Sequence, residues 1–398
     1  MPNLYKSYII PFIEIGAKIL SIFTIFIIIR LLTQEDFGQF NYINSIVLVF
    51  SIFLDLGTNS KAYTLSLQNK LTDLSRLFYT RIILSATILI LFNLIILLLT
   101  NLSFATIGVY SIVIWLTSLI AFLKLISRGR GFYRLDALAI TIEPFFKTLF
   151  LIIVFYQINN ISIDKLYLLL LSVSSLSIII ILLKVKNYFS FSFSSNFFKW
   201  HEIKKTIFTT KYFILYYVFL VAIQRIEIFF IKERINFETV AIYFSAFNLI
   251  LVIQLFLRSS ITSRYKLFVD KKIGRRQLFL ELGIALLVIL VISYYTIPWV
   301  FSIVYTNDYF AGITIFRILL LILPFYLINT FFINHFNVIN MPQINTIILS
   351  ITFTVKLIVL LLLNSLTMTN YAWLSIGFEV FITLGFSIAF MPLKFKKS

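Results

Sequence analysis

Residues 344–363 read INTIILSITFTVKLIVLLLL, and Lys356 is the one charged side chain among them. About 20 apolar residues cross a bilayer as a helix, because only a helix satisfies its own backbone hydrogen bonds in hydrocarbon. This stretch therefore predicts a transmembrane helix that carries a lysine. Of the 398 residues in the chain, 60% are hydrophobic and 13% are charged, whereas soluble domains have about 25% charged residues. The composition excludes an ordinary soluble enzyme, a disordered chain and a disulfide-built secreted scaffold.

Twelve such stretches lie along the chain. They are Tyr8–Ile29, Asn41–Leu56, Leu77–Leu99, Phe104–Leu123, Ala137–Tyr156, Leu166–Leu183, Tyr212–Ile231, Val240–Leu257, Leu278–Val304, Ile313–Asn337, Ile344–Leu363 and Tyr371–Met391. The first is too long for the apolar region of a signal peptide and lacks a small-residue cleavage site, so it is interpreted as a span. The predicted fold is an all-α polytopic membrane protein with twelve transmembrane helices in two six-helix bundles.

The connections between spans alternate in charge. Those on the side of the N-terminus hold 25 lysine and arginine residues, and those on the opposite side hold four, namely Arg30, Lys165, Lys232 and Arg234. Positive residues collect on the cytoplasmic side of multi-pass proteins, so both termini are predicted to lie in the cytoplasm. Orientation in the lipid bilayer also accounts for the net charge of +18. No nucleic-acid partner is expected, because no stretch outside the spans is long enough for a separate binding domain.

The spacing of the spans divides the chain into two halves. Residues 1–184 form the predicted N-terminal six-helix lobe, residues 185–211 a cytoplasmic linker lying on the membrane surface, and residues 212–398 the C-terminal six-helix lobe. The linker is rich in phenylalanine, serine and lysine, as expected for a segment on an anionic leaflet. At an offset of 203 residues, Glu35–Phe40 aligns with Glu238–Tyr243. Parallel repeats of this kind are common in transporters, with the substrate path between the halves.

Ten of the charged residues inside the predicted spans are taken as intramembrane, where each costs at least about 2.5–3.5 kcal/mol near the bilayer centre. The cations are Lys18, Lys147, Arg225, Arg317 and Lys356, and the anions are Glu14, Asp55, Glu143, Glu227 and Glu379. We expect the cations to bind an anionic cargo, such as a phosphate or pyrophosphate. The four glutamates are candidate sites for a coupling ion, H⁺ or Na⁺, and spacing does not say which of them binds it.

Helical spacing predicts some of the partners of these charges. Glu14 and Lys18 are four residues apart, as are Glu143 and Lys147, so each pair shares a helix face; the alternative to a functional role is mutual neutralisation. Lys356 has no acidic residue at this spacing and is expected to be unpaired.

The remaining intramembrane cations also lack an acid at helical spacing. Arg317 has none four residues away, and Arg225 is two residues from Glu227, so these two side chains are expected to point to different sides of their helix. Tyrosine pairs such as Tyr216 and Tyr217 either stack on sugar rings or pack inside the protein.

No cofactor is expected from the sequence. The chain has no cysteine and two histidines, so it offers neither a thiolate metal site nor a histidine cluster. It also has no Walker A glycine loop, which excludes ATP-driven transport within this chain.

Four motifs stand at the ends of spans. They are RLLTQEDFGQF at residues 30–40, DLG at residues 55–57, RIE at residues 225–227 followed by TVAIYFSA at residues 239–246, and NDYFA at residues 307–311. Taken in this order, they resemble the Wzx-type polysaccharide or O-antigen flippases of the multidrug/oligosaccharidyl-lipid/polysaccharide (MOP) exporter superfamily. Two positions depart from the family pattern, because Glu227 replaces the usual aspartate and Ala241 the usual glycine.

The resemblance implies a MOP/MATE-like fold and a cargo. Such flippases carry an undecaprenyl-pyrophosphate-linked oligosaccharide, the repeat unit of O-antigen or capsule, from the inner to the outer leaflet of the bacterial inner membrane by alternating access. The resemblance also implies a part in the conformational change for the motif residues Arg30 and Asp55, and partnership with other membrane proteins of polysaccharide assembly.

Two other functions fit parts of the sequence. A membrane glycosyltransferase or polymerase would use the acidic pair Glu35 and Asp36, but such enzymes carry large outward loops and none is present here. A drug or cation antiporter of the same superfamily would need an acidic cavity, which the balance of five cations and five anions fits poorly.

Overall fold

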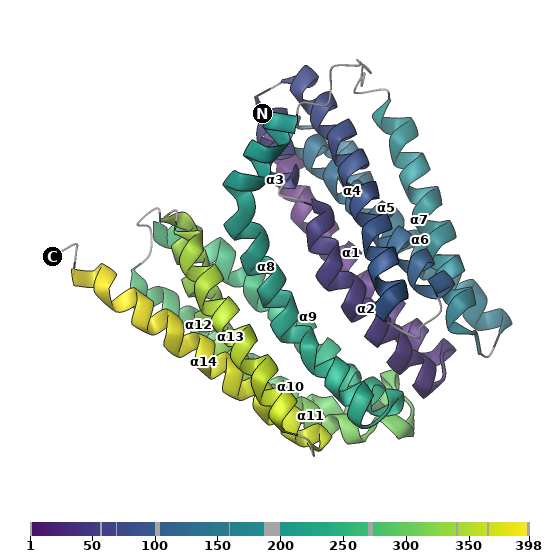
Figure 1. Ribbon diagram of the computed structural model, residues 1–398, viewed down its shortest axis with the longest axis vertical. Coiled ribbons are helices and arrows are strands. Elements are labelled where there is room, and N and C mark those ends of the chain that lie inside the picture. The colour runs from purple at the N-terminus through teal and green to yellow at the C-terminus, as the bar shows by residue number, and fades with distance from the viewer. Residues whose placement is uncertain are drawn as a thin grey trace. The chain divides into compact units, whose positions relative to one another are not determined.

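The computed structural model (Figure 1) describes residues 2–55, 58–68, 70–99, 104–158, 160–186, 200–269, 274–339, 341–363 and 366–395. Within these ranges every regular element is a helix. The chain divides into two compact units. Unit 1 comprises Met1–Asp36 and Ile43–Ile214, and unit 2 comprises Phe37–Tyr42 and Leu215–Ser398.

Each of the twelve predicted spans falls on a helix or, for the tenth, on a pair of helices. In the described part of the chain, ten helices are long and apolar enough to cross a membrane, and a bent helix pair forms an eleventh candidate. The first predicted span corresponds to α1, a helix of 30 residues. The predicted all-α polytopic architecture is therefore confirmed.

Unit 1 is a bundle built around α5 and α6. Its helices are α1 (Pro2–Leu31), α2 (Gln34–Asp55), α3 (Thr58–Leu67), α4 (Leu71–Leu99), α5 (Phe104–Gly129), α6 (Tyr133–Gln157) and α7 (Ile163–Val185). α1 packs along α6, and α5 contacts α3, α4, α6 and α7. The short helix α3 was not predicted, because its ten residues are too few and too polar for a span.

A tight turn joins α5 to α6. Gly131 has φ of +71°, a conformation that residues with a Cβ rarely adopt. The Phe132 N–H donates to the Ser127 carbonyl at 2.9 Å, and the Gly131 N–H donates to the Arg128 carbonyl at 3.1 Å. These bonds satisfy carbonyl groups at the end of α5 and fix where α6 begins.

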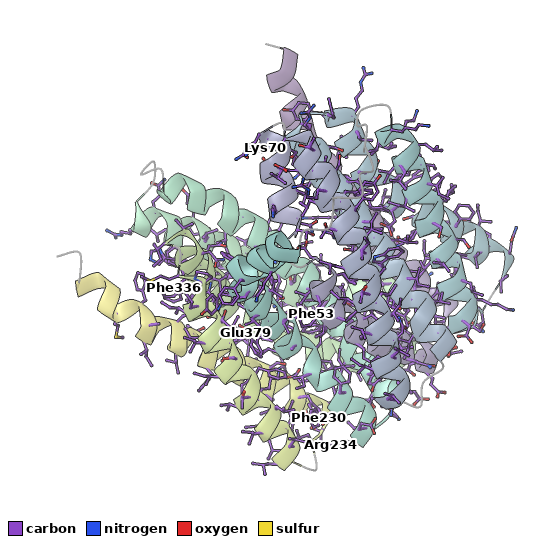
Figure 2. All side chains as sticks on the ribbon, turned by 45° about the horizontal axis from the view of Figure 1, so that its top comes forward. Phe53, Lys70, Phe230, Arg234, Phe336 and Glu379 are labelled. Atoms are coloured by element: carbon purple, nitrogen blue, oxygen red, sulfur yellow. The ribbon has the colours of Figure 1, made fainter. Side chains whose placement is uncertain are left out.

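Unit 2 holds the second set of helices. They are α8 (Trp200–Arg234, of which the part from Leu215 belongs to unit 2), α9 (Phe237–Val269), α10 (Arg275–Val304), the 3₁₀ turn η2 (Asn307–Tyr309), α11 (Ala311–Leu319), α12 (Ile322–Val338), α13 (Pro342–Leu362) and α14 (Met368–Phe395). α14 packs on α11, α12 and α13, while α9 packs on α10, α11 and α12. Phe336 and Phe386 stack in the apolar core between α12 and α14 (Figure 2).

The tenth predicted span is broken in two. α11 and α12 meet at a bend of 42°. Pro324 stands third in α12 and has no N–H to donate to the carbonyl of Leu320, so the helical ladder is interrupted there. The sequence predicted one continuous helix over this region, because the proline lies within an unbroken apolar run.

The offset of 203 residues found in the sequence also relates helix boundaries. α1 ends at Leu31 and α8 at Arg234, and α2 begins at Gln34 and α9 at Phe237. A steric reason explains why glycine stands at position 38 in the first motif. A Cβ there would lie 1.9 Å from the Phe237 carbonyl oxygen within unit 2.

The predicted linker can be followed only in part. Residues 187–199 lie outside the described residues, and residues 200–211 form the first turns of α8.

Candidate functional site

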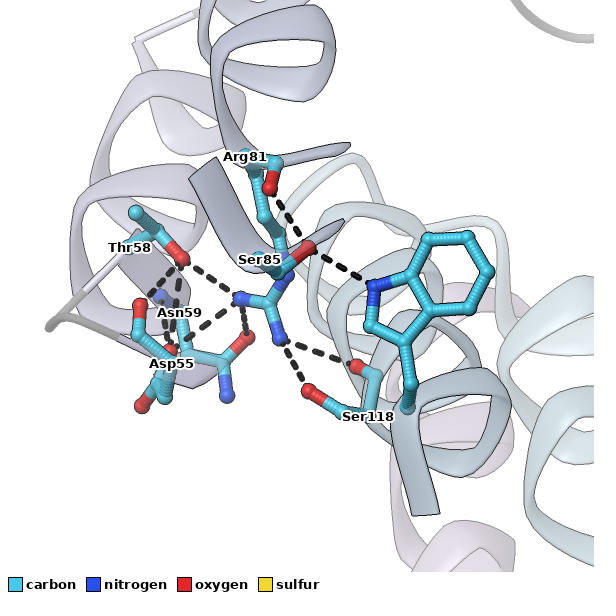
Figure 3. Close-up of polar contacts among 7 residues, drawn as sticks. Asp55, Thr58, Asn59, Arg81, Ser85 and Ser118 are labelled. Carbon is cyan, nitrogen blue, oxygen red and sulfur yellow. Dashed lines mark hydrogen bonds and ion pairs between the residues drawn. The ribbon is translucent and has the colours of Figure 1, made fainter. Parts of the chain in front are cut away.

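Arg81 is the centre of a polar network in unit 1, and its side chain is 1% exposed. Figure 3 shows its guanidinium group between three short segments. Nη1 donates to Asp55 Oδ1 at 3.1 Å, to Thr58 Oγ1 at 2.5 Å and to Asn59 Oδ1 at 2.8 Å. Nη2 donates to the hydroxyl and the carbonyl of Ser118 at 2.7 and 3.0 Å. The network ties α4 to the junction of α2 with α3 and to α5.

Asp55 also caps the helix that begins at this junction. Its Oδ1 accepts the backbone N–H of Asn59 at 3.0 Å, which satisfies a donor in the first turn of α3. Arg30 lies in the last turn of α1, at the opposite end of α2 from Asp55, and 22 helical residues put these ends about 30 Å apart. The structure therefore does not bring the two predicted gate residues into one site.

Arg128 joins two carboxylates in unit 1. Its Nε donates to Asp136 Oδ2 at 2.9 Å, and its Nη2 donates to Glu14 Oε1 at 2.7 Å; Lys124 Nζ lies 3.8 Å from the same oxygen. Glu14 thus forms its ion pairs with Arg128 and Lys124 of α5, while Lys18, four residues along α1, adds a longer-range electrostatic attraction. Lys18 is exposed.

The pair predicted on α6 is present. Lys147 Nζ lies 2.7 Å from Glu143 Oε1, and the Thr117 and Ser174 hydroxyls donate to the same oxygen at 2.8 and 3.0 Å. The Glu143 side chain is 7% exposed and that of Lys147 is 21% exposed, so the carboxylate is sequestered while the ammonium group retains access to its surroundings. The helical spacing of this pair is confirmed.

Lys356 corrects the expectation drawn from its spacing. Its ammonium group lies 2.7 Å from Glu227 Oε1, and both side chains are 2% exposed. It also donates to the Ile223 carbonyl at 2.8 Å. The partner stands on α8 rather than on α13, and a rule about residues four apart on one helix cannot detect a pair between helices.

Glu227 has further hydrogen-bond donors. The Tyr243 hydroxyl donates to Oε2 at 2.6 Å, and the Ser375 hydroxyl lies 2.6 Å from both carboxylate oxygens. The carboxylate is thereby held by α9, α13 and α14 at once. Such additional bonds are what a buried ion pair needs to offset the loss of hydration.

The two arginines of unit 2 inside spans lie over aromatic rings. The guanidinium carbon of Arg225 is 4.8 Å from the Phe244 ring centre, and that of Arg317 is 4.7 Å from the Tyr294 ring centre. In the described part of the chain, no acidic side chain lies within ion-pair distance of Arg317, and its buried Nε has no hydrogen-bond partner. Arg225 and Glu227 contact different groups, as their spacing predicts.

Glu379 lies at a polar cavity of about 60 Å³ inside unit 2 (Figure 2 labels this residue on α14). Its Oε2 accepts a hydrogen bond from Asn329 Nδ2 at 2.7 Å. Polar side chains from α8, α9 and α12 line the cavity. They are Tyr216, Tyr217, Arg258, Tyr326, Asn329, Thr330, Asn334 and Asn337. Tyr216 and Tyr217 stack on each other at a centroid distance of 4.4 Å, so this pair packs within the protein.

Sequence reasoning missed several of these residues. Arg81 and Arg128 were counted among the connections, although Arg81 falls inside the predicted span Leu77–Leu99. Arg258 was likewise assigned to a connection, because α9 continues to Val269, well beyond the predicted end of its span. The spacing of Thr330, Asn334 and Asn337 on one face of span ten is a signal that the prediction did not use.

The motif at residues 307–311 packs between helices. The Tyr305 hydroxyl donates to the Ser245 carbonyl at 2.9 Å, and the Tyr309 ring contacts those of Tyr305 and Phe37 within unit 2. Burial raises the pKa of Tyr305 above its ordinary value, so the hydroxyl keeps its proton as a donor. In the described residues, no three His, Asp or Glu side chains come together to hold a metal ion.

Solved structures share this fold. An outward-facing multidrug resistance MATE family transporter of the MOP superfamily is 17% identical, with a TM-score of 0.66 over 100% of this chain and 96% of that one. An inward-facing multidrug resistance MATE family transporter is 14% identical, with a TM-score of 0.67 over 95% of this chain and 95% of that one. A MOP superfamily transporter from Pyrococcus furiosus is 14% identical, with a TM-score of 0.65 over 99% of this chain and 95% of that one. It is described by a reversed polarity of its binding pocket.

The chain thus has the fold of these transporters, and its long apolar helices are those of a multi-pass membrane protein. Residues 6–265 match the family model described as polysaccharide biosynthesis protein. The chain belongs to this family. No curated protein sequence matches it.

Proposed function

We propose that the protein is a flippase that moves an undecaprenyl-pyrophosphate-linked oligosaccharide repeat unit, of the O-antigen or capsule type, from the inner to the outer leaflet of a bacterial inner membrane. The observation that carries the proposal is the combination of a polysaccharide biosynthesis family with a MOP transporter fold over the whole chain. A protein of this family built as a transporter is suited to move a lipid-linked intermediate of glycan assembly across the bilayer.

The mode of transport in this proposal is alternating access. The likeness to transporters solved in outward-facing and inward-facing forms supports it. The charge of the connections supports an orientation with both termini in the cytoplasm. In this orientation the cargo enters from the leaflet where lipid-linked glycans are built, and other membrane proteins of polysaccharide assembly receive it on the outer side.

Arg317 is the residue in this proposal that best suits an anionic headgroup. Its guanidinium group is held by stacking on Tyr294, and the described residues offer it no carboxylate. A planar guanidinium with vacant donors binds phosphate oxygens in a fork geometry. Lys147 and Lys356 are less suited, because each already neutralises a glutamate of its own unit.

The acidic pair of the glycosyltransferase alternative has a structural explanation. Glu35 and Asp36 lie in the first turn of α2, and the Asp36 N–H donates to the Thr33 hydroxyl oxygen at 3.1 Å. Carboxylates at a helix N-terminus are stabilised by the helix dipole. This position explains the pair without a catalytic role.

A complementation experiment tests the flippase function. The gene is deleted, and surface polysaccharide is measured together with the lipid-linked repeat unit that accumulates in the membrane. We expect loss of surface glycan, rescue by the wild-type gene and failure of rescue by Arg317→Ala. Arg317→Lys should rescue partly, because a point charge replaces the fork. Arg276→Ala, which removes an exposed arginine at the start of α10, is the matched control and should rescue fully. Normal surface glycan in the deletion strain would refute the proposal.

A further inference from the structure

Of the four glutamates predicted as candidate sites for a coupling ion, one differs from the other three. Glu14, Glu143 and Glu227 each lie 2.7 Å from a cationic nitrogen of their own unit. In the described residues, no cation lies within ion-pair distance of Glu379, although the side chain is buried and the residue is 9% exposed. A buried carboxylate without a neutralising cation is costly in its charged form, so a proton is the group that completes it.

The amide that contacts Glu379 is fixed in one orientation. Asn329 Nδ2 donates to Glu379 Oε2 at 2.7 Å and to the Glu379 carbonyl at 3.1 Å. The Thr383 hydroxyl donates to Asn329 Oδ1 at 2.9 Å. The amide nitrogen is therefore presented to the carboxyl group, which stabilises the ionised form enough for a proton to leave as well as to bind.

The cavity next to Glu379 is of a size and polarity that suits water. A polar site of about 60 Å³ holds a small number of water molecules, while an engineered cavity that binds benzene measures about 150 Å³. A sugar ring is therefore too large for it. The buried Nδ2 of Asn334 lines this cavity and has no hydrogen-bond partner among the described residues, so it needs an acceptor such as a water oxygen.

The charged groups around Glu379 favour a proton over a metal cation. On α13, Lys356 is engaged by Glu227 of α8. On α9, Arg258 lines the same cavity and donates to the Tyr217 hydroxyl at 3.2 Å. α12 contributes Tyr326 and, farther along, His335, whose ring stacks on Phe331; α11 contributes Arg317, which stacks on Tyr294. A guanidinium and amide donors in one small cavity disfavour Na⁺, which needs a shell of oxygen ligands.

We propose that Glu379 is the proton-binding site of this transporter, reached through the water-filled cavity of unit 2. A hydronium ion in the cavity gives its proton to the carboxylate, an O–H bond forms on Glu379, and a water molecule is left behind; release reverses these steps. The coupling of this proton to transport rests on the proposed function, whereas the binding of the proton does not.

Infrared spectroscopy of the full-length protein in lipid nanodiscs tests the site directly. The C=O absorption of a protonated carboxylic acid is followed as a function of pH. We expect one titrating band in the wild type that Glu379→Gln removes and that the control Glu238→Gln, which changes an exposed glutamate in the first turn of α9, leaves in place. A band that survives Glu379→Gln overturns the proposal. A band that is lost on adding Na⁺ at constant pH also overturns it, in favour of a sodium site.

A second variant keeps the test valid if Glu379→Gln does not fold. Asn329→Leu removes the donor that stabilises the ionised carboxyl group and should move the midpoint of the same band to higher pH by about 1–2 units. An unchanged midpoint contradicts the proposal. The complementation experiment and the titration test separate proposals. Normal surface glycan after deletion would refute the flippase function. The titration would then still describe a proton site, in a transporter of another cargo.

Discussion

The two units neutralise their buried charges in different ways. In unit 1 the cations Arg81, Arg128 and Lys147 each contact a carboxylate within 3.1 Å. In unit 2 one pair, Lys356 with Glu227, follows the same rule, but Arg317 stacks on a ring and Glu379 is contacted by a neutral amide. These three cations of unit 1 are therefore already paired within the protein. Among the described residues of unit 2, Arg317 and Glu379 have no oppositely charged side chain within ion-pair distance, and we place the binding of cargo and proton there.

Breaking the ion pair of unit 2 should have the largest effect on stability. Lys356→Met leaves Glu227 charged in a site where both side chains are 2% exposed, and we expect a loss of about 3–5 kcal/mol in the free energy of unfolding. Thermal unfolding in detergent measures it. The double variant Lys356→Met with Glu227→Gln should recover most of the loss, since no charge is then stranded. An unaltered unfolding temperature for the single variant would contradict the assigned pair.

The corresponding change in unit 1 should cost less. Arg81→Leu removes the donor to Asp55, Thr58 and Ser118, and we expect a loss of about 2–3 kcal/mol. Asp55 is the reason for the smaller value, because its side chain is 36% exposed and can be hydrated when the arginine is gone.

Arg76→Leu is the matched control for Arg81→Leu. It stands on the same helix and contacts Asp73 at 3.6 Å, with both side chains partly exposed. Exposed pairs contribute about 0–1 kcal/mol, so the control should unfold almost as the wild type does. Equal losses in the two variants would show that burial does not set the difference.

The fold followed from the sequence to a large extent, and the site only in part. Length and hydropathy located each span, because a helix in lipid has few alternatives. The pair Glu143 and Lys147 was predictable, because both residues lie on one helix. Lys356 with Glu227, and Glu14 with Arg128, join different helices, and which helices meet is decided by packing that one sequence does not encode in its spacing.

The boundaries of the spans account for the other misses. Arg81, Arg128 and Arg258 were counted as connection residues, because a positive residue at the end of an apolar run is ordinarily solvated. In the structure α4 begins at Leu71, α5 continues to Gly129 and α9 to Val269, so these arginines lie within helices and turn inward to partners or to the cavity. The break at Pro324 was similarly hidden within an apolar run.

Glu143→Gln should sharpen the comparison within unit 1. The amide oxygen can still accept from Thr117 and Ser174, and Lys147 is 21% exposed, so it is not stranded in the way that Glu227 would be. We expect a loss of about 1–2 kcal/mol in the free energy of unfolding, measured as before. A loss as large as that of Lys356→Met would mean that the two units do not differ in how tightly their pairs are enclosed.

Lys18→Ala should have the smallest effect on stability. The side chain is exposed, and Glu14 keeps its contacts with Arg128 and Lys124, so the free energy of unfolding should change by less than about 0.5 kcal/mol. Arg128→Leu, by contrast, removes the group that Glu14 and Asp136 share and should destabilise the protein clearly. Because Lys18→Ala leaves the fold intact, the same variant separates an effect on transport from an effect on stability. If this exposed cation contacts the anionic cargo, surface glycan falls while the unfolding temperature stays constant. If Lys18→Ala destabilised the protein, Glu14 would be paired with Lys18 on α1, as the spacing predicts. In the structure Glu14 pairs with Arg128 and Lys124 of α5.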